Sequence, residues 1–340
     1  MTLIAAFQVR RQAVLIGDLT LHSAASAQRL VSINSSCTIA WAGEPDEAAG
    51  VVADLHNLLG EQHPTRDRLS RYFEERRPRN PFIGLFTTAD EHVHILAYNA
   101  RRVVAPALSG PAYCAGSADA KDGFSRFIER APPGADAADA RTVVASANSL
   151  IASLAAREAD PPAGGNGAAY QMAIACDGNV GKLADTTQIY WEARVAGSQI
   201  RLRSPGLFVH HDYAGKDFIV RSARCEPGGI KTLVPFERQT CVAVHAPTAG
   251  MAGAPSGLER SHWPDFNAAL EAHFVRVAFD DGEKRVLSLP NFLSEASQRT
   301  IEFRDHAGGT TVRIRAAASD TIIRSIRAAI ADRSVVGLAG

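Results

Sequence analysis

Residues 2–18 have the sequence TLIAAFQVRRQAVLIGD. This segment is apolar over 3–7, polar over 8–12 and apolar again over 13–16, which predicts two short strands joined by a turn. A second strand pair is predicted at 30–33 and 37–41, on either side of a polar Asn-Ser-Ser turn. The chain is therefore expected to begin with antiparallel sheet.

Helices and further strands alternate after this start. A helix is predicted between Pro45 and the stop at Gly60, because apolar residues recur on one face. The arginine-rich segment 66–79 also contains acidic residues and indicates a second helix with a solvated face. The remaining predictions are strands at 82–87, 92–98, 113–115 and 168–176, with helices near 124–128 and 143–154. This order predicts an α+β fold of two packed sheets flanked by helices.

The pattern changes beyond about residue 187. Strands are predicted first at 199–203 and 207–211, and later near 274–279, 300–304 and 310–315, before a closing helix capped by Ser319. Residues 247–257 are rich in Gly, Ala and Pro and resemble a linker. The predicted organisation is a first domain over 1–187, a β-rich extension over 188–246 and a small α/β module over 258–340.

Composition excludes some classes of partner. The chain of 340 residues has 36 basic and 36 acidic side chains. It therefore lacks the long-range positive field that would attract nucleic acids or anionic membranes. No apolar run is long enough to span a bilayer. Its five cysteines form no CxxC pair, which suits thiols in a reducing compartment. We therefore expect a cytoplasmic protein without nucleic-acid or membrane partners, whose N-terminus lies near Met1.

The Met-Thr start gives Thr2 a possible chemical role. Removal of Met1 would free the α-amine of Thr2, and an α-amine with a pKa near 8 can take the proton of the hydroxyl on the same residue. One residue would then supply both nucleophile and base.

Six segments follow one another along the chain: 2–7, 13–18, 29–34, 38–43, 113–117 and 168–178. Their order and spacing resemble those of the β subunits of proteasomes and their bacterial relatives over roughly residues 2–185. The second ends in an aspartate at the family's distance from the threonine, the fourth ends in Ala-Gly, and the fifth ends in Gly-Ser. The resemblance implies a four-layer αββα sandwich of the N-terminal-nucleophile hydrolases and a ring or other homo-oligomer.

The resemblance also implies a role for each matching residue. Thr2 would be nucleophile and proton acceptor, and the N–H of Gly43 would donate to the oxyanion of the tetrahedral intermediate. Asp18 would orient the cation beside Thr2, and Ser117 would hydrogen-bond near the amine. Arg29 stands where the family has its catalytic lysine. No cofactor or metal is implied.

Several features depart from the family pattern. Arginine stays charged and can orient and stabilise, whereas lysine can also relay a proton. The loop between Asp18 and Arg29, which in the family shapes the pocket for the substrate side chain, is shorter here. The shape of the pocket and its specificity are therefore not predicted. The family's other aspartate has no clean match, since Asp160 is displaced by a couple of residues. An alternative for Asp18 and Arg29 is a buried ion pair that joins two strands.

Two functions follow from these observations. The first is a threonine peptidase or amidohydrolase that acts through an acyl-enzyme on Thr2. The second is a non-catalytic proteasome-like scaffold whose C-terminal part binds a partner, with the need for a separate ATPase left open. A metal site at His210-His211-Asp212 is disfavoured, because neighbouring residues of a strand point to opposite faces. Residues 178–182 lack the spacing of a phosphate loop and are predicted as a turn.

Overall fold

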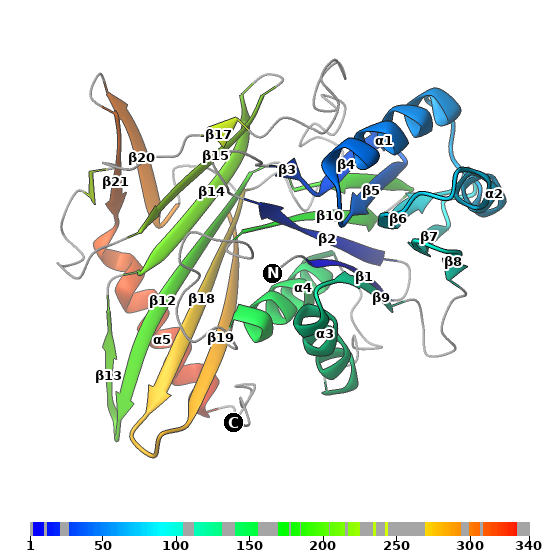
Figure 1. Ribbon diagram of the computed structural model, residues 1–340. Coiled ribbons are helices and arrows are strands. Elements are labelled where there is room, and N and C mark those ends of the chain that lie inside the picture. The colour runs from blue at the N-terminus through cyan, green and yellow to red at the C-terminus, as the bar shows by residue number, and fades with distance from the viewer. Residues whose placement is uncertain are drawn as a thin grey trace.

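The computed structural model describes most of the chain, and within that part the protein mixes helices with a larger number of strands (Figure 1). The described residues are 3–9, 12–20, 27–104, 112–130, 140–155, 169–176, 178–183, 185–203, 205–214, 217–224, 234–235, 242–243, 269–293, 299–306 and 309–331. The predicted α+β class is confirmed.

Sheet I contains the predicted N-terminal hairpin, and its order is β11-β10-β2-β1-β9, with β3 attached to β2. Its strands are β1 (Leu3–Val9), β2 (Gln12–Thr20), β3 (Ala27–Gln28), β9 (Ala112–Gly116), β10 (Tyr170–Cys176) and β11 (Asn179–Lys182). All pairings are antiparallel. The predicted turn at 178–182 is wrong over most of its length, because residues 179–182 pair with β10 as β11.

Sheet II has the order β4-β5-β6-β7-β8. Its strands are β4 (Leu30–Asn34), β5 (Cys37–Trp41), β6 (Pro81–Thr87), β7 (Val93–Asn99) and β8 (Val103–Val104). The predicted helices are α1 (Pro45–Leu59), which begins on its proline, and α2 (Arg66–Arg76). Thr65 caps α2, since its hydroxyl accepts the Arg68 N–H at 3.2 Å.

Three apolar clusters define the layers of this part. Residues of α1 and α2, such as Val52 and Phe73, pack on one face of sheet II. Residues such as Ile4 and Ile83 join sheet I to sheet II. The outer face of sheet I is covered by α3 (Ala118–Arg130) and α4 (Ala140–Ala155). Each sheet therefore has its own pair of covering helices (Figure 1).

Sheet III forms most of the C-terminal part, with the order β17-β15-β14-β12-β18-β19 and β13 attached to β12. Its strands are β12 (Thr186–Ala196), β13 (Gln199–Leu202), β14 (Leu207–Ala214), β15 (Asp217–Arg224), β17 (Val242–Ala243), β18 (Ala269–Phe279) and β19 (Lys284–Leu293). Because β12 and β18 pair in parallel, the predicted extension and the predicted module both contribute strands to sheet III. The predicted linker at 247–257 lies outside the described residues.

The last elements are a small sheet and a helix. Sheet IV contains β16 (Val234–Pro235), β20 (Ile301–His306) and β21 (Gly309–Ile314), and α5 (Ala316–Ala331) follows it. Ile322 and Ile326 of α5 pack against residues of sheet III such as Trp191. The predicted cap at Ser319 is wrong, because three alanines with high helix propensity extend α5 back to residue 316.

Candidate functional site

Strand pairing brings several of the predicted site residues to one end of sheet I. Leu3, the first described residue of β1, is paired with Gly116, the residue before Ser117. Ile4 is paired with Gly17, the residue before Asp18. The start of β1 therefore lies between the ends of β2 and β9 that carry Asp18 and Ser117. The predicted nucleophile, Thr2, lies outside the described residues.

Asp18 is fully buried. Burial raises its pKa from the ordinary value of 3.8 to about 6, while the Arg29 guanidinium and the Leu3 backbone N–H act in the opposite direction. Neither carboxylate oxygen completes a hydrogen bond of normal geometry with the residues that the structure describes. A buried carboxyl group in this state can exchange a proton near neutral pH, which is a common property of active sites.

Arg29 connects Asp18 to the loop after β5. Its Nε lies 3.9 Å from Asp18 Oδ1, and its Nη1 donates a hydrogen bond of 3.0 Å to the Gly43 carbonyl. The guanidinium carbon lies 4.3 Å from the centroid of the Trp41 ring, a distance at which a cation and a ring attract each other. Burial lowers the pKa of Arg29, whereas Asp18 and Glu44 raise it. The structure thus brings Asp18, Arg29 and Gly43 together.

Gly43 is held in a conformation that favours glycine. Its φ is +115°, and a Cβ built at this position would overlap the Asn80 side-chain oxygen. That oxygen accepts the Glu44 N–H at 2.9 Å, and Asn80 Nδ2 donates to the Glu44 carbonyl at 2.7 Å. Asn80 therefore fixes the loop that presents the Gly43 backbone, and no local sequence pattern marks it as a site residue.

Ser117 begins α3. Its hydroxyl accepts the Ala120 N–H at 3.3 Å, and its carbonyl accepts the Lys121 N–H at 3.1 Å. This is helix capping. A serine hydroxyl that accepts one hydrogen bond can still donate another, so capping is compatible with the predicted role beside the threonine amine.

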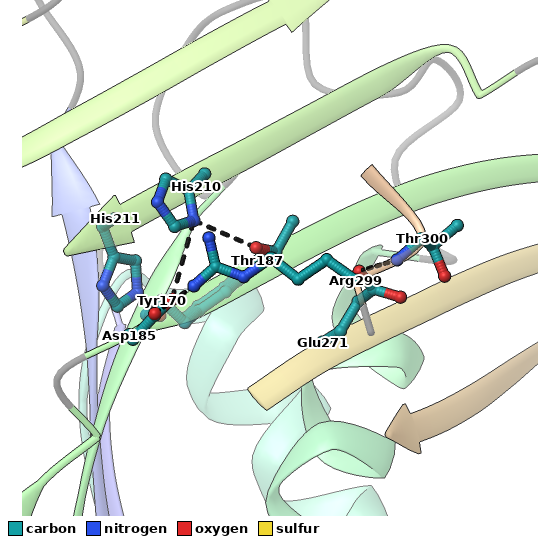
Figure 2. Close-up of polar contacts among 8 residues, drawn as sticks. All are labelled: Tyr170, Asp185, Thr187, His210, His211, Glu271, Arg299 and Thr300. Carbon is teal, nitrogen blue, oxygen red and sulfur yellow. Dashed lines mark hydrogen bonds and ion pairs between the residues drawn. The ribbon is translucent and has the colours of Figure 1, made fainter. Parts of the chain in front are cut away.

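A second polar cluster lies at the junction of sheets I and III (Figure 2). Asp185 forms an ion pair with Arg299, and its Oδ1 lies 3.8 Å from Nδ1 of the buried His210. The same ring nitrogen lies 3.0 Å from the Thr187 hydroxyl. A nucleophile–base–acid relay needs its outer members on opposite ring nitrogens, so this arrangement does not form one.

The neighbouring contacts of this cluster join distant segments. His211 Nε2 lies 3.2 Å from the Tyr170 carbonyl, and Glu271 accepts the Thr300 N–H at 2.8 Å (Figure 2). Glu271 also lies 2.9 Å from His273 Nε2. Within the described part of the chain no three His, Cys, Asp or Glu side chains are grouped as metal ligands. The contacts of this cluster bind segments of sheet to one another.

Comparison with family models and with curated proteins finds no match.

The first cluster has the more specific chemistry. It combines a carboxyl group with a pKa of about 6, a guanidinium that stays charged and a glycine backbone held by Asn80. All three lie where the chain enters β1. Such groups can orient an amine, stabilise negative charge and donate a backbone hydrogen bond to an oxyanion.

Helix length bears on the membrane prediction. None of the helices in the described part of the chain is both long and apolar enough to cross a lipid bilayer.

Proposed function

We propose that this chain is a threonine-type N-terminal-nucleophile hydrolase, similar to proteasome β subunits, that cleaves amide bonds and chiefly those of peptides. One observation carries the proposal: strand register brings the start of β1 between Gly17-Asp18 and Gly116-Ser117, with Arg29 3.9 Å from Asp18. These are the neighbours that the resemblance assigns to a catalytic Thr2.

The arrangement of layers supports the fold that this function requires. Helices α1 and α2 cover sheet II, sheet II packs on sheet I, and α3 and α4 cover the other face of sheet I. We propose that these layers are the four-layer αββα sandwich of the N-terminal-nucleophile hydrolases.

The reaction follows from the chemistry of an N-terminal threonine. The Thr2 hydroxyl oxygen attacks the amide carbonyl carbon, and the hydroxyl proton passes to the Thr2 α-amine. The Gly43 N–H donates to the oxygen of the tetrahedral intermediate. The carbon–nitrogen bond then breaks, the leaving amine takes the proton from the α-ammonium, and an ester on Thr2 remains. Water hydrolyses this ester in a second step.

Asp18 and Arg29 have distinct roles in this scheme. Asp18 holds positive charge beside the threonine, first that of Arg29 and then that of the α-ammonium that forms during attack. Arg29 supplies a fixed charge and holds the Gly43 carbonyl, which fixes the Gly43–Glu44 peptide next to the one that carries the Gly43 N–H. Because arginine does not give up its proton in proteins, proton transfer in this scheme rests on the α-amine.

A non-catalytic scaffold is the second candidate. The contacts that favour it are those of Arg29 with the Gly43 carbonyl and the Trp41 ring, since a guanidinium held in this way can have a purely structural role and join the start of β4 to the loop after β5. In this case Asp18 would neutralise a structural cation. The sandwich would then serve an assembly, and the C-terminal part would bind a partner.

Both candidates share further proposals about the protein's setting. We propose a homo-oligomer in the cytoplasm that needs no cofactor, with peptides as the substrates of the hydrolase. The described thiols Cys37 and Cys114 are free, which suits a reducing compartment. The need for a separate ATPase that unfolds substrates is left open in this proposal.

Two measurements test the hydrolase. Intact mass determines whether Met1 is removed, because a retained Met1 blocks the Thr2 amine and excludes the mechanism. A peptide β-lactone, which acylates nucleophilic hydroxyls, is then expected to modify the wild-type chain once, in the peptide that begins with Thr2. Thr2→Ala should abolish the modification and Thr2→Ser should retain it. Acylation that persists in Thr2→Ala, or fails in the wild type with a free Thr2 amine, would refute the proposal.

A further inference from the structure

Lys182 is a buried lysine in the layer between sheets I and II. It ends β11, where it is paired with Ala173 of β10, and Ala173 belongs to the apolar cluster that joins the two sheets. Only 8 % of Lys182 is exposed. Burial lowers the pKa of its amine from 10.5 to about 7. An ammonium group is costly to bury, so a lysine in this position must be held by specific acceptors.

Two of these acceptors are the residues on either side of Arg29. Lys182 Nζ donates to the Gln28 side-chain oxygen at 3.0 Å and to the Leu30 carbonyl at 2.8 Å. The two bonds come from one nitrogen on sheet I and hold the short segment that leads from β3 into β4. Arg29 is the residue between the two points that are held.

The held segment also contacts Trp41. The Trp41 indole N–H donates to the Gln28 carbonyl at 3.1 Å, and the Trp41 backbone N–H donates to the Arg29 carbonyl at 3.0 Å. The Arg29 guanidinium then lies over the indole ring. A displacement of residues 28–30 would therefore be felt by Trp41 as well as by the guanidinium beside Asp18.

We propose that Lys182 is a positioning residue that places the Arg29 guanidinium between Asp18 and the Gly43 carbonyl by holding the residues before and after Arg29. Its effect on catalysis rests on the proposed hydrolase, whereas its effect on Arg29 does not. The lysine comes from a strand more than 150 positions along the chain from Arg29. It acts on the site through Arg29 and is not assigned a contact with substrate.

The test compares Lys182→Met with Asn34→Leu in the full-length chain. Lys182→Met removes the charge and both donated bonds while keeping an unbranched apolar side chain. Asn34→Leu removes a buried polar group at the other end of β4, where Asn34 Nδ2 donates to the Gly60 and Gln62 carbonyls. Asn34 Oδ1 also accepts the backbone N–H and the hydroxyl of Ser36, so Asn34→Leu removes at least as many hydrogen bonds from β4 as Lys182→Met does, but only Lys182→Met affects the end of β4 next to Arg29.

The first readout does not depend on activity. The chain has three tryptophans, so protein labelled with 5-fluorotryptophan gives three fluorine resonances, and Trp41→Phe identifies the one from Trp41. We expect the Trp41 resonance to shift in Lys182→Met and to stay in place in Asn34→Leu. If Lys182→Met does not fold, Gln28→Leu removes one of the two acceptors and should shift the same resonance. An unmoved Trp41 resonance in the folded variant would overturn the inference.

The second readout is the rate of Thr2 acylation by the peptide β-lactone as a function of pH. We expect Lys182→Met to lower this rate by about tenfold or more, because small displacements of a positioned group slow catalysis strongly, and Asn34→Leu to leave the rate per folded molecule unchanged. Equal rates in Lys182→Met and the wild type would contradict the inference. If the wild type is not acylated, the hydrolase proposal fails, and the Trp41 resonance alone decides the role of Lys182.

Discussion

The buried carboxyl group of Asp18 predicts a specific pH dependence of stability. Its pKa is raised from 3.8 to about 6 in the folded protein. A raised pKa means that the folded state binds this proton more tightly than the unfolded state does. The stability associated with Asp18 is therefore fully present below a pH of about 3.8 and is lost as the pH rises through about 6.

The size of the effect follows from the same values. The pKa difference corresponds to roughly 3 kcal/mol, since each pKa unit is worth about 1.4 kcal/mol. Between about pH 4 and about pH 8 the loss is roughly 2.5 kcal/mol, because the unfolded carboxyl group is already partly ionised at the lower pH. Asp18→Asn removes the titration. The free energy of unfolding of Asp18→Asn, relative to the wild type, should thus increase by about this amount over the range.

Urea unfolding followed by circular dichroism measures this difference at each pH. The exchange of a carboxyl group for an amide adds a pH-independent offset, and the attraction of Arg29 is already part of the pKa of Asp18. The change with pH, and not the value at one pH, therefore carries the test. Asp54→Asn is the matched control, because Asp54 is a half-exposed carboxylate that pairs with Arg76. A difference between Asp18→Asn and the wild type that is constant with pH, or that falls as the pH rises, would refute the reasoning.

Three further outcomes are expected. Gly43→Ala should lower the free energy of unfolding by about 2 kcal/mol or more in urea titrations. Gly197 also has a positive φ but lies in open space, so Gly197→Ala should lower the free energy of unfolding by less. Equal losses in the two variants would contradict the overlap at Gly43. Arg299→Met should destabilise the chain by about 3 kcal/mol, because it removes the ion-pair partner of the mostly buried Asp185, and a loss below about 1 kcal/mol would argue against this pair. The pKa of Lys182 is lowered to about 7, so wild-type stability should rise relative to Lys182→Met as the pH increases, by about 3 kcal/mol between about pH 7 and about pH 9.5. A flat difference in the same unfolding assay would contradict that shift.

The N-terminal strands could be predicted because their information is local. Alternation between apolar and polar runs fixes the β1–β2 hairpin, and a proline and a glycine mark the two ends of α1. Asp18 and Gly43 are assigned by the resemblance to proteasome β subunits, at positions where such segments end. The geometry between them depends on packing, however, and no local pattern shows that Arg29 bonds the Gly43 carbonyl.

The residues that sequence analysis missed depend on contacts between distant segments. Asn80 acts on a loop 36 positions earlier in the chain, and a single Asn before a proline gives no sign of this. Lys182 ends a four-residue strand. Gly178 just before this strand, together with Asn179 and Gly181 within it, predicts a turn. His210 approaches Asp185 only because β14 pairs with β12, and Arg299 reaches the same carboxylate from another segment. These clusters arise from tertiary pairing and not from spacing along the chain.

The strand beside Asp18 is held in part by the C-terminal sheet. Tyr170 of β10 is paired with Asp18 of β2, and β11, on the other edge of β10, ends opposite Ala173. The Gln188 side chain accepts the Tyr170 N–H at 3.1 Å and donates to the Tyr170 carbonyl at 2.8 Å, as a neighbouring strand would. His211 Nε2 reaches the same carbonyl. Since buried backbone groups must be paired, residues of sheet III complete the pairing of β10 at the position next to Asp18.

The apolar packing between sheet III and the N-terminal part is continuous as well, because Phe274 of sheet III belongs to the same apolar cluster as α4 and β1. The C-terminal sheet therefore contributes to the environment that keeps the Asp18 carboxyl group buried.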